Sequence, residues 1–187
     1  MKAHIVTQLS SRDLESVETH FLQLSAEDRR LRFGLSLPDS AVRDYVARID
    51  FDDQAVFGVF DETMKLDAVA HLARKDASAE LGISVLTAAR GRGLGTALLA
   101  RSHTHARNWG VEDLLMQCLT ENAPMMHIAA KQGMKIGQHL GEASAYLKLP
   151  PADVDSRSDA VIGQRMAVLD GARKLGRMLN EQERPNF

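Results

Sequence analysis

The glycine-rich stretch ARGRGLGTALL, Ala89–Leu99, limits what this chain can fold into more than any other feature. Three glycines and two arginines alternate there, and small and apolar residues follow without a break. Glycine lets the backbone turn tightly and lets a ligand approach it closely. The first turn of a helix has free N–H groups and a partial positive charge. A strand, a glycine turn and a helix start in this order form an anion cradle, so we expect a phosphorylated ligand here.

Two other phosphate-binding patterns fit this stretch poorly. The dinucleotide fingerprint is GxGxxG, whereas Gly91, Gly93 and Gly95 are spaced as GxGxG. No GKS or GKT is present, which excludes a P-loop. The remaining alternative is a glycine-rich loop that only turns the chain.

Hydrophobic periodicity predicts strands and helices on both sides of the glycine stretch. We expect strands at residues 4–9, 54–60, 66–73, 79–86, 111–119, 134–139 and 144–149. We expect helices at about 13–24, 39–49, 95–108 and 122–132, and a mostly helical tail at 153–183. The segment SAEDRRLRF, residues 25–33, reads as a charged turn. Three strands in succession before the glycines predict an antiparallel meander, so the fold class is α/β of the α+β kind.

Composition narrows the functional classes. The 187 residues are 44% hydrophobic and 26% charged, which suits one globular domain with an appendage. A net charge of -2 gives no electrostatic reason to expect nucleic acid or a membrane as partner. The single cysteine, Cys118, excludes a disulfide within the chain and suits a reducing compartment. The N-terminus has no signal-peptide pattern and no long apolar run occurs, so we expect a cytoplasmic protein.

Two blocks of the sequence resemble the GNAT acyltransferase superfamily. RGRGLG, Arg90–Gly95, matches its [Q/R]-x-x-G-x-[G/A] signature, between a strand and a helix. NAPMMHIAAKQGM, Asn122–Met134, is similar to its N-x-x-M-x-x-L-A-x-K-x-G-F pattern. The resemblance is strong over residues 80–137, loose before residue 80, and absent beyond Pro150.

The resemblance implies a GNAT fold, with a mixed, mostly antiparallel central sheet flanked by helices. Residues 1–149 would form the acetyltransferase domain, and residues 150–187 a C-terminal helical extension. It implies a bacterial-type N-acetyltransferase that moves an acetyl group from acetyl-CoA to a primary amine by direct attack in a ternary complex.

The resemblance also implies where acetyl-CoA binds. The family holds the pyrophosphate on the backbone amides of its signature, here Arg90, Gly91, Arg92, Gly93, Leu94, Gly95 and Thr96. The preceding strand pairs through its backbone with the pantetheine arm, as an added strand would; the matching residues are Ile83, Ser84 and Val85. Asn122 matches an asparagine that contacts the cofactor near its thiol end, and its position equally suits a helix N-cap.

Catalytic residues are less well defined. Glu80 matches the carboxylate that serves as base, and burial in an apolar strand would raise its pKa; the alternative is a strand-edge glutamate with its head in water. The family's tyrosine acid falls at Ala129, and an alternative glutamate base falls at Gln117. Tyr146 is a candidate acid by residue type only. His71 is a lone histidine on a strand, and such histidines are more often structural than catalytic. We expect Cys118 to be an inert, buried thiol. We expect no metal site.

Several alternatives stay open. The chain is either an enzyme or a non-catalytic acyl-CoA-binding sensor or partner-binding module. The acceptor is a protein lysine, a peptide N-terminus or a small amine. Arg29, Arg30 and Arg32 resemble a stretch of the family's bacterial protein lysine acetyltransferases, but we favour the alternative that they form a solvated charged turn. The amphipathic tail either packs on its own domain or pairs with a second copy as a homodimer.

Overall fold

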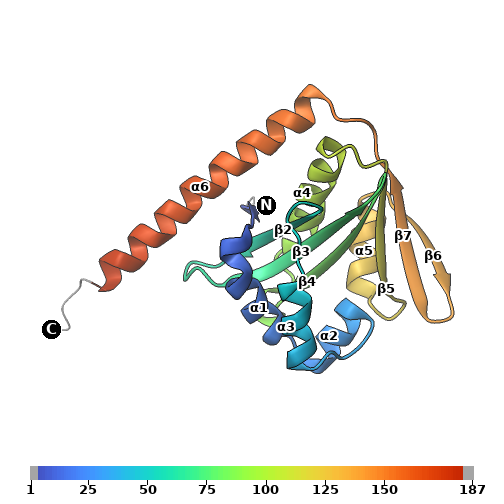
Figure 1. The fold of residues 1–187 in the computed structure, drawn as a ribbon, viewed down its shortest axis with the longest axis horizontal. Helices are drawn as coiled ribbons and strands as arrows, with labels where there is room; N and C mark the ends of the chain where they lie inside the picture. The colour runs from blue at the N-terminus through green and yellow to red at the C-terminus, as the bar shows by residue number, and fades with distance from the viewer. Residues whose placement is uncertain (1–3, 183–187) are drawn as a thin grey trace.

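A computed structural model describes residues 4–182, and in it seven strands form one sheet (Figure 1). The strands are β1 Thr7–Gln8, β2 Gln54–Phe60, β3 Leu66–Lys75, β4 Ser78–Val85, β5 Asp113–Leu119, β6 Lys135–His139 and β7 Glu142–Lys148. Their order is β1-β2-β3-β4-β5-β7-β6, and all neighbours are antiparallel except β4 and β5. The expected meander is β2–β3–β4, and the mixed, mostly antiparallel sheet is confirmed.

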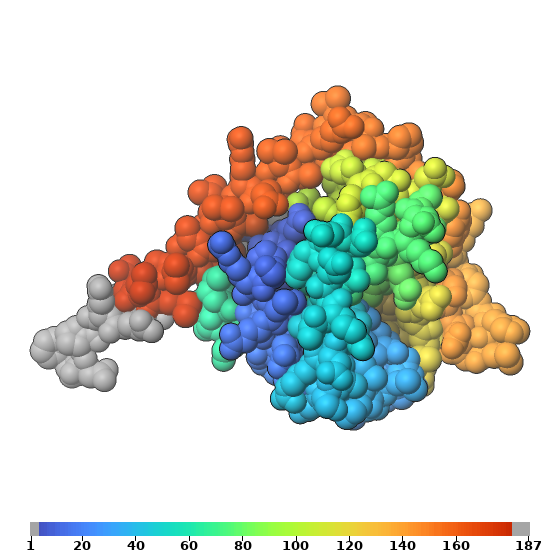
Figure 2. Space-filling view, viewed as in Figure 1, coloured from blue at the N-terminus to red at the C-terminus, as the bar shows by residue number. Residues whose placement is uncertain are grey.

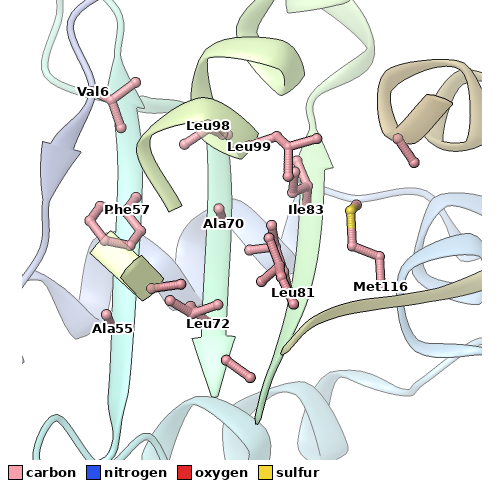
Figure 3. Packing of buried hydrophobic residues seen from close by; sticks show 14 of the residues in the cluster. Val6, Ala55, Phe57, Ala70, Leu72, Leu81, Ile83, Leu98, Leu99 and Met116 are labelled. Atoms are coloured by element: carbon pink, nitrogen blue, oxygen red, sulfur yellow. The ribbon is translucent and has the colours of Figure 1, made fainter. Parts of the chain in front are cut away.

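Helices cover both faces of the sheet. They are α1 Leu14–Leu22, α2 Ala26–Phe33, α3 Asp39–Ala47, α4 Leu94–Asn108, α5 Ala123–Lys131 and α6 Val154–Gln182, with short 3-10 turns at Ser11–Asp13 and Thr87–Ala89. Side chains alternate between the two faces of each strand. On β2, Val56 therefore packs with α1 and α3, whereas Phe57 packs in the larger core under α4. Figure 3 shows that core, with Phe57, Leu72 and Leu81 of three neighbouring strands beside Leu98 and Leu99 of α4.

The expected charged turn at residues 25–33 is wrong, because this segment forms helix α2. Ser25 caps the helix by accepting a hydrogen bond from the Asp28 amide at 3.1 Å. Acidic residues occupy the first turn and basic residues the last, which complements the helix dipole. Gly34 then ends the helix in the left-handed conformation. The charges are thus arranged along a helix axis, which a count of charged residues does not reveal.

The final hairpin differs slightly from its expected bounds. Strand β7 begins at Glu142, two residues earlier than expected, and β6 begins at Lys135. The turn between them consists of Leu140 and Gly141, whose φ angles are 47° and 87°. Because two residues with positive φ suffice for a tight hairpin turn, the strands extend closer to each other than the sequence indicates.

The C-terminal extension is one long helix, α6, of 29 residues. It confirms the helical tail, although Glu183 lies outside the described residues. Figure 1 shows α6 leaving the end of β7, passing α4 and continuing beyond the sheet. Arg107 of α4 binds Asp153 at 2.8 Å, and Lys174 Nζ donates to the Phe60 carbonyl at 2.8 Å. Within residues 4–182, no helix has the length and apolar character needed to cross a membrane.

Candidate functional site

Strands β4 and β5 separate partway along their length, and this gap organises the site. Their pairing covers only Ser78–Glu80 of β4 against Asp113–Leu115 of β5. Beyond Glu80, β4 continues to Val85, while β5 stays paired with β7 up to Leu119. A small cavity lies in the gap, between Gly82 and Ile83 on one side and Gln117 and Cys118 on the other. This part of the β4 edge is therefore open to an extended ligand.

The glycine stretch joins the open strand to α4. Gly91 and Gly93 have φ angles of 73° and 87°, so both need the left-handed conformation that glycine adopts without strain. Gly93 is the N-cap of α4, and the Ala97 amide makes a hydrogen bond to its carbonyl at 3.1 Å. The amides of Leu94–Thr96 precede this bond and are the free donors of the helix N-terminus. The expected anion cradle is thus present as backbone geometry.

A cavity of about 570 Å³ connects this cradle with the open edge of β4. Its lining includes nearly all the residues expected to hold acetyl-CoA: Ile83, Ser84, Val85, Arg90, Gly91, Gly93, Leu94, Gly95, Thr96 and Asn122. Residues of α2 and α5 form the other wall. The length of this cavity from the cradle to the gap suits a ligand with an anionic end and an extended arm.

The two arginines of the stretch behave differently. Arg90 lines the cavity, and its guanidinium binds Asp28 at 2.6 Å. Burial tends to raise the pKa of Asp28, but hydrogen bonds from Arg90 and Ser25 outweigh it and hold the pKa below its usual value. Arg92 does not line the cavity, because its guanidinium binds Asp67 at 3.1 Å. The charge of Arg90 is therefore partly neutralised, while the amides of Leu94–Thr96 remain free donors.

Asn122 has the helix-capping role expected of it, and its position also leaves it at the cavities. Its Oδ1 accepts a hydrogen bond from the Met125 amide at 3.3 Å, so it caps α5. It also lines both the larger cavity and the small one in the gap. Neither role excludes the other.

A second cavity, of about 550 Å³, lies on the opposite side of the gap. Glu80 lines it, together with Glu142 of β7 and residues of α2 and α3. The burial expected for Glu80 is wrong, because its side chain is exposed. Ala79, Leu81 and Ile83 point toward the core under α4, so strand alternation directs Glu80 to the other face.

Arg32 occupies the junction of the cavities and lines all three. Its guanidinium lies against the backbone of Gly82, where the Cβ of any other residue would collide with it. It also lies over the Phe33 ring, with the guanidinium carbon 4.8 Å from the ring centroid. Its Nε is buried and has no hydrogen-bond partner within the described chain. A positive charge is thus held where the two larger cavities meet.

A hydrogen-bond chain runs from Arg32 into the second cavity. Arg32 can only donate, so it donates to the Tyr45 hydroxyl oxygen at 3.1 Å. The Tyr45 hydrogen is then directed to Nδ1 of His71, and Nε2–H of His71 donates to Oε1 of Gln54 at 2.8 Å. Burial, with the nearby charge of Arg32, lowers the pKa of His71 to about 4. His71 is therefore neutral near pH 7 and acts as a hydrogen-bond acceptor for Tyr45.

A second buried histidine holds Ser84. Nδ1–H of His20 donates to the Leu66 carbonyl at 2.9 Å, so its Nε2 accepts from the Ser84 hydroxyl at 2.8 Å. Burial lowers the pKa of His20 to about 4, although the hydrogen bond to Leu66 opposes the shift. The Ser84 hydroxyl hydrogen is thus occupied, so its side chain has no donor left for a ligand in the cavity.

The remaining sequence candidates lie apart from this arrangement. Tyr146 lines none of the cavities described above, and its hydroxyl donates to Asp113 at 2.7 Å. Ala129 is buried in the core. Burial raises the pKa of the Cys118 thiol, which is half-buried at the gap. Over residues 4–182, no three histidine, cysteine, aspartate or glutamate side chains gather closely enough to hold a metal ion.

Sequence reasoning missed Tyr45, Arg32, His20 and Gln54. Each is an ordinary residue of a helix or strand in the sequence. Their partners lie 13 to 64 residues away along the chain. The only indication was the arginine cluster that includes Arg32.

The fold is similar to that of several solved structures. The GNAT domain of PAT from S. lividans is 22% identical, with a TM-score of 0.67 over 77% of this chain and 89% of that one. Ribosomal-protein-alanine N-acetyltransferase from Brucella melitensis is 20% identical, with a TM-score of 0.62 over 77% and 99%. Spermidine N-acetyltransferase from Vibrio cholerae, solved with CoA and spermine, is 17% identical, with a TM-score of 0.64 over 78% and 95%.

The sequence itself matches a family model. The model describes an acetyltransferase (GNAT) domain and matches residues 5–135, which is most of the chain. The matched region contains the open strand, the glycine cradle and helix α5. The chain therefore belongs to the GNAT acetyltransferase family.

Proposed function

We propose that this protein is an N-acetyltransferase that transfers an acetyl group from acetyl-CoA to a primary amine. The observation that carries the proposal is that two cavities, one ending at an anion cradle, meet at the β4–β5 gap. Leu31 and Arg32 line both cavities and the small one between them. A thioester reaching the gap from one side can thus meet an amine arriving from the other, which is the geometry that direct transfer requires.

Acetyl-CoA suits the first cavity. The free amides of Leu94–Thr96 suit its pyrophosphate, as backbone donors at a helix N-terminus commonly bind phosphate. The open edge of Ile83–Val85 suits the amide-bearing pantetheine arm, which adds to β4 as a short strand. When bound, the molecule supplies the thioester that the amine attacks.

Glu80 is the base in this proposal. An alkylamine has a pKa of about 10 and arrives as an ammonium, which cannot attack. Glu80 accepts the proton, directly or through one water. The amine nitrogen then bonds to the thioester carbonyl carbon, the C–S bond breaks and the thiolate leaves. The second proton of the amine, which is now on the new amide nitrogen, passes to the thiolate or to water. Because a thiol has a pKa of about 8.5, the thiolate can leave without a proton, so the absence of tyrosine at Ala129 does not prevent the reaction.

Arg32 and Tyr45 assist at the junction. Arg32 places a cation near the carbonyl oxygen on which negative charge develops. Its charge also favours the neutral form of an amine in the same cavity. Tyr45 directs its hydrogen to His71, so its free lone pair can accept an N–H of the amine. Tyr45 is thus a positioning residue, whereas Tyr146 has no place in this account.

The acceptor cavity favours a cationic amine. Glu80 and Glu142 bring two carboxylates to its lining, and both attract an ammonium. A polyamine, a lysine side chain and a peptide N-terminus all satisfy this chemistry. The solved structures with the same fold include enzymes named for spermidine and for a ribosomal-protein alanine, so both classes belong in an acceptor panel. A reducing, cytoplasmic setting suits the single cysteine.

The competing function is an acyl-CoA-binding module without catalysis. Ala129 and Gln117 favour it, because both stand where the family carries proton-handling residues. Calorimetry with acetyl-CoA and CoA, followed by thiol release against spermidine, lysine peptides and N-terminal alanine peptides, separates the two. Binding with release for one class supports the enzyme. Binding without release from any of the panel favours the module, and failure to bind either compound overturns both.

A further inference from the structure

Helix α6 places its large apolar residues on the side away from its own domain. Of the eleven large hydrophobic residues that are exposed in the described chain, eight lie on α6: Val154, Val161, Ile162, Met166, Val168, Leu169, Leu175 and Leu179. The residues that face the domain are mostly small or polar, such as Ser156, Ala167 and Lys174. The apolar face of α6 thus points to solvent, whereas a helix that packs on its own core turns its apolar face inward.

The exposed residues form one continuous stripe. Val154, Val161, Val168 and Leu175 recur every seven residues, and Ala172 and Leu179 follow four residues after Val168 and Leu175. Ile162 and Leu169 lie beside them on one flank. A repeat of seven with apolar residues at two positions is the pattern of a helix that pairs with another helix. Here the first position is apolar in all four repeats, and the second, which holds Ser158, Arg165, Ala172 and Leu179, is apolar in the C-terminal half. Figure 2 shows α6, in orange and red, lying along the outside of the molecule and reaching past the rest of it.

We propose that this stripe is covered by α6 of a second copy, in an antiparallel homodimer. In that orientation, the charges on one flank of the stripe meet opposite charges on the same flank of the second copy. Asp155 and Asp159 lie in the N-terminal half, and Arg173 and Arg177 lie on the same flank in the C-terminal half. In an antiparallel pair, like flanks face each other with the halves reversed. Each aspartate pair therefore lies beside the arginine pair of the second copy, while Arg173 and Arg177 remain near Glu62 of their own domain.

The apolar residues obey the same symmetry. The midpoint of the charges is residue 166, and Ile162 lies four residues before it and Leu169 three residues after it. An antiparallel arrangement therefore places Ile162 within one residue of Leu169 of the second copy. A parallel arrangement would instead place this flank against the polar Arg157 and Gln164.

Two features distinguish a second copy from a membrane surface as the occupant. Membrane-surface helices use Trp, Phe and Leu on the apolar face and Lys or Arg on the polar face. Residues 154–182 contain no aromatic residue, and the flank of the stripe carries Asp155 and Asp159. Arg165 is the one charged residue on the stripe, near its midpoint, where the two copies bring their guanidinium groups together. It weakens the pair, so Arg165→Leu should tighten association.

Light scattering and sedimentation over a concentration series test the proposal. The full chain should approach twice its mass of 20.6 kDa, and Val168→Asp should weaken association at least tenfold. Both Val168, 67% exposed, and the control Leu140, 90% exposed on the β6–β7 turn, carry large apolar side chains in solvent. Leu140→Asp should leave association unchanged. A monomer at every concentration, or a dimer whose association is not weakened by Val168→Asp, would overturn the proposal.

Cysteine cross-linking in a Cys118→Ser background tests the orientation. In an antiparallel pair only positions near the midpoint meet their own copy, so Val168→Cys should cross-link with itself through a short bismaleimide. Val154→Cys should not link with itself, but should link when mixed with Leu179→Cys. Self-linking of Val154→Cys would show a parallel pair and contradict the arrangement. A chain that binds anionic vesicles through the stripe and never self-associates would assign the surface to a membrane instead.

Discussion

Tyr45 of α3 donates its hydroxyl hydrogen to Nδ1 of His71 on β3, and this bond fixes where the phenolic oxygen can accept. The hydroxyl oxygen receives Arg32 at 3.1 Å, and its remaining lone pair is free to accept another donor within the cavity that Glu80 also lines. We expect Tyr45→Phe to lower kcat/KM for the amine about tenfold, the loss of one hydrogen bond to a charged or polar group. Steady-state thiol release measures it, and the Kd for acetyl-CoA should not change. Tyr146→Phe is the matched control, and an equal effect of the two variants would contradict the placement of Tyr45.

Glu80→Gln should reduce kcat by about a hundredfold or more, as expected for loss of a general base. The amide keeps the size of the side chain but accepts no proton. Binding of acetyl-CoA should stay within twofold, because Glu80 lines the acceptor cavity and not the cradle. Glu142 lines the same cavity, so Glu142→Gln is the control that removes one negative charge without removing the proposed base. If the two variants lose the same activity, Glu80 contributes only attraction for the ammonium.

Gly93→Ala should weaken CoA binding by about tenfold or more. Gly93 has a φ angle of 87° and forms the N-cap of α4, so a side chain forces the cradle amides to shift. A left-handed residue other than glycine costs about 1–2 kcal/mol of stability. Gly110→Ala, at φ 76° after α4, carries the same backbone penalty away from the cradle. Calorimetry and thermal unfolding should show similar losses of stability for both, and weaker CoA binding for Gly93→Ala alone.

Acid should destabilise the fold well before its carboxylates titrate. The pKa values of His20 and His71 are lowered to about 4, chiefly by burial, whereas an unfolded histidine has a pKa of about 6.5. The unfolded chain therefore binds more protons between these values. The contribution to stability is fully present above about pH 6.5 and is lost as the pH falls toward 4, by up to about 1.4 kcal/mol per pH unit for each histidine.

Urea unfolding between pH 4.5 and 7.5 measures this slope. His20→Gln should flatten it, because the variant removes one of the three histidines, with His71 and His105, whose pKa is lowered to about 4. His139→Gln, which changes an exposed histidine on β6, should leave the slope as it is. A slope that is unchanged in His20→Gln would mean that His20 does not contribute to acid sensitivity.

The order of strands and helices could be predicted because it depends on local sequence patterns. Alternation in β2–β4, the glycines before α4 and the Asn-Pro start of α5 each depend on a few adjacent residues. Helix α2 was predicted as a turn because its residues are mostly charged. That the charges favour a helix becomes clear only when their positions along a helix axis are considered. The cradle of Leu94–Thr96 was predictable for the same local reason, since backbone amides at a helix start need no distant partner.

The acceptor side of the site could not be predicted in this way. Arg32 reaches Tyr45, Tyr45 reaches His71, and His20 reaches Ser84 only when distant elements come together. The exposure of Glu80 depends on which face of β4 the helices leave uncovered. The outward direction of the stripe on α6 likewise depends on how the helix docks, because periodicity predicts an apolar face without saying what covers it.

In the proposed function, activity depends on backbone hydrogen bonds that the short pairing of β4 with β5 leaves unmade. Beyond Glu80, backbone N–H and C=O groups lie open to solvent. If the two strands were paired along their full length, these groups would hydrogen-bond to each other. Substitutions that closed the gap would stabilise the chain and remove the place where, in the proposed function, donor and acceptor meet. Directed evolution for heat resistance alone should therefore accumulate inactive variants along these two strands, whereas selection for turnover should keep them apart.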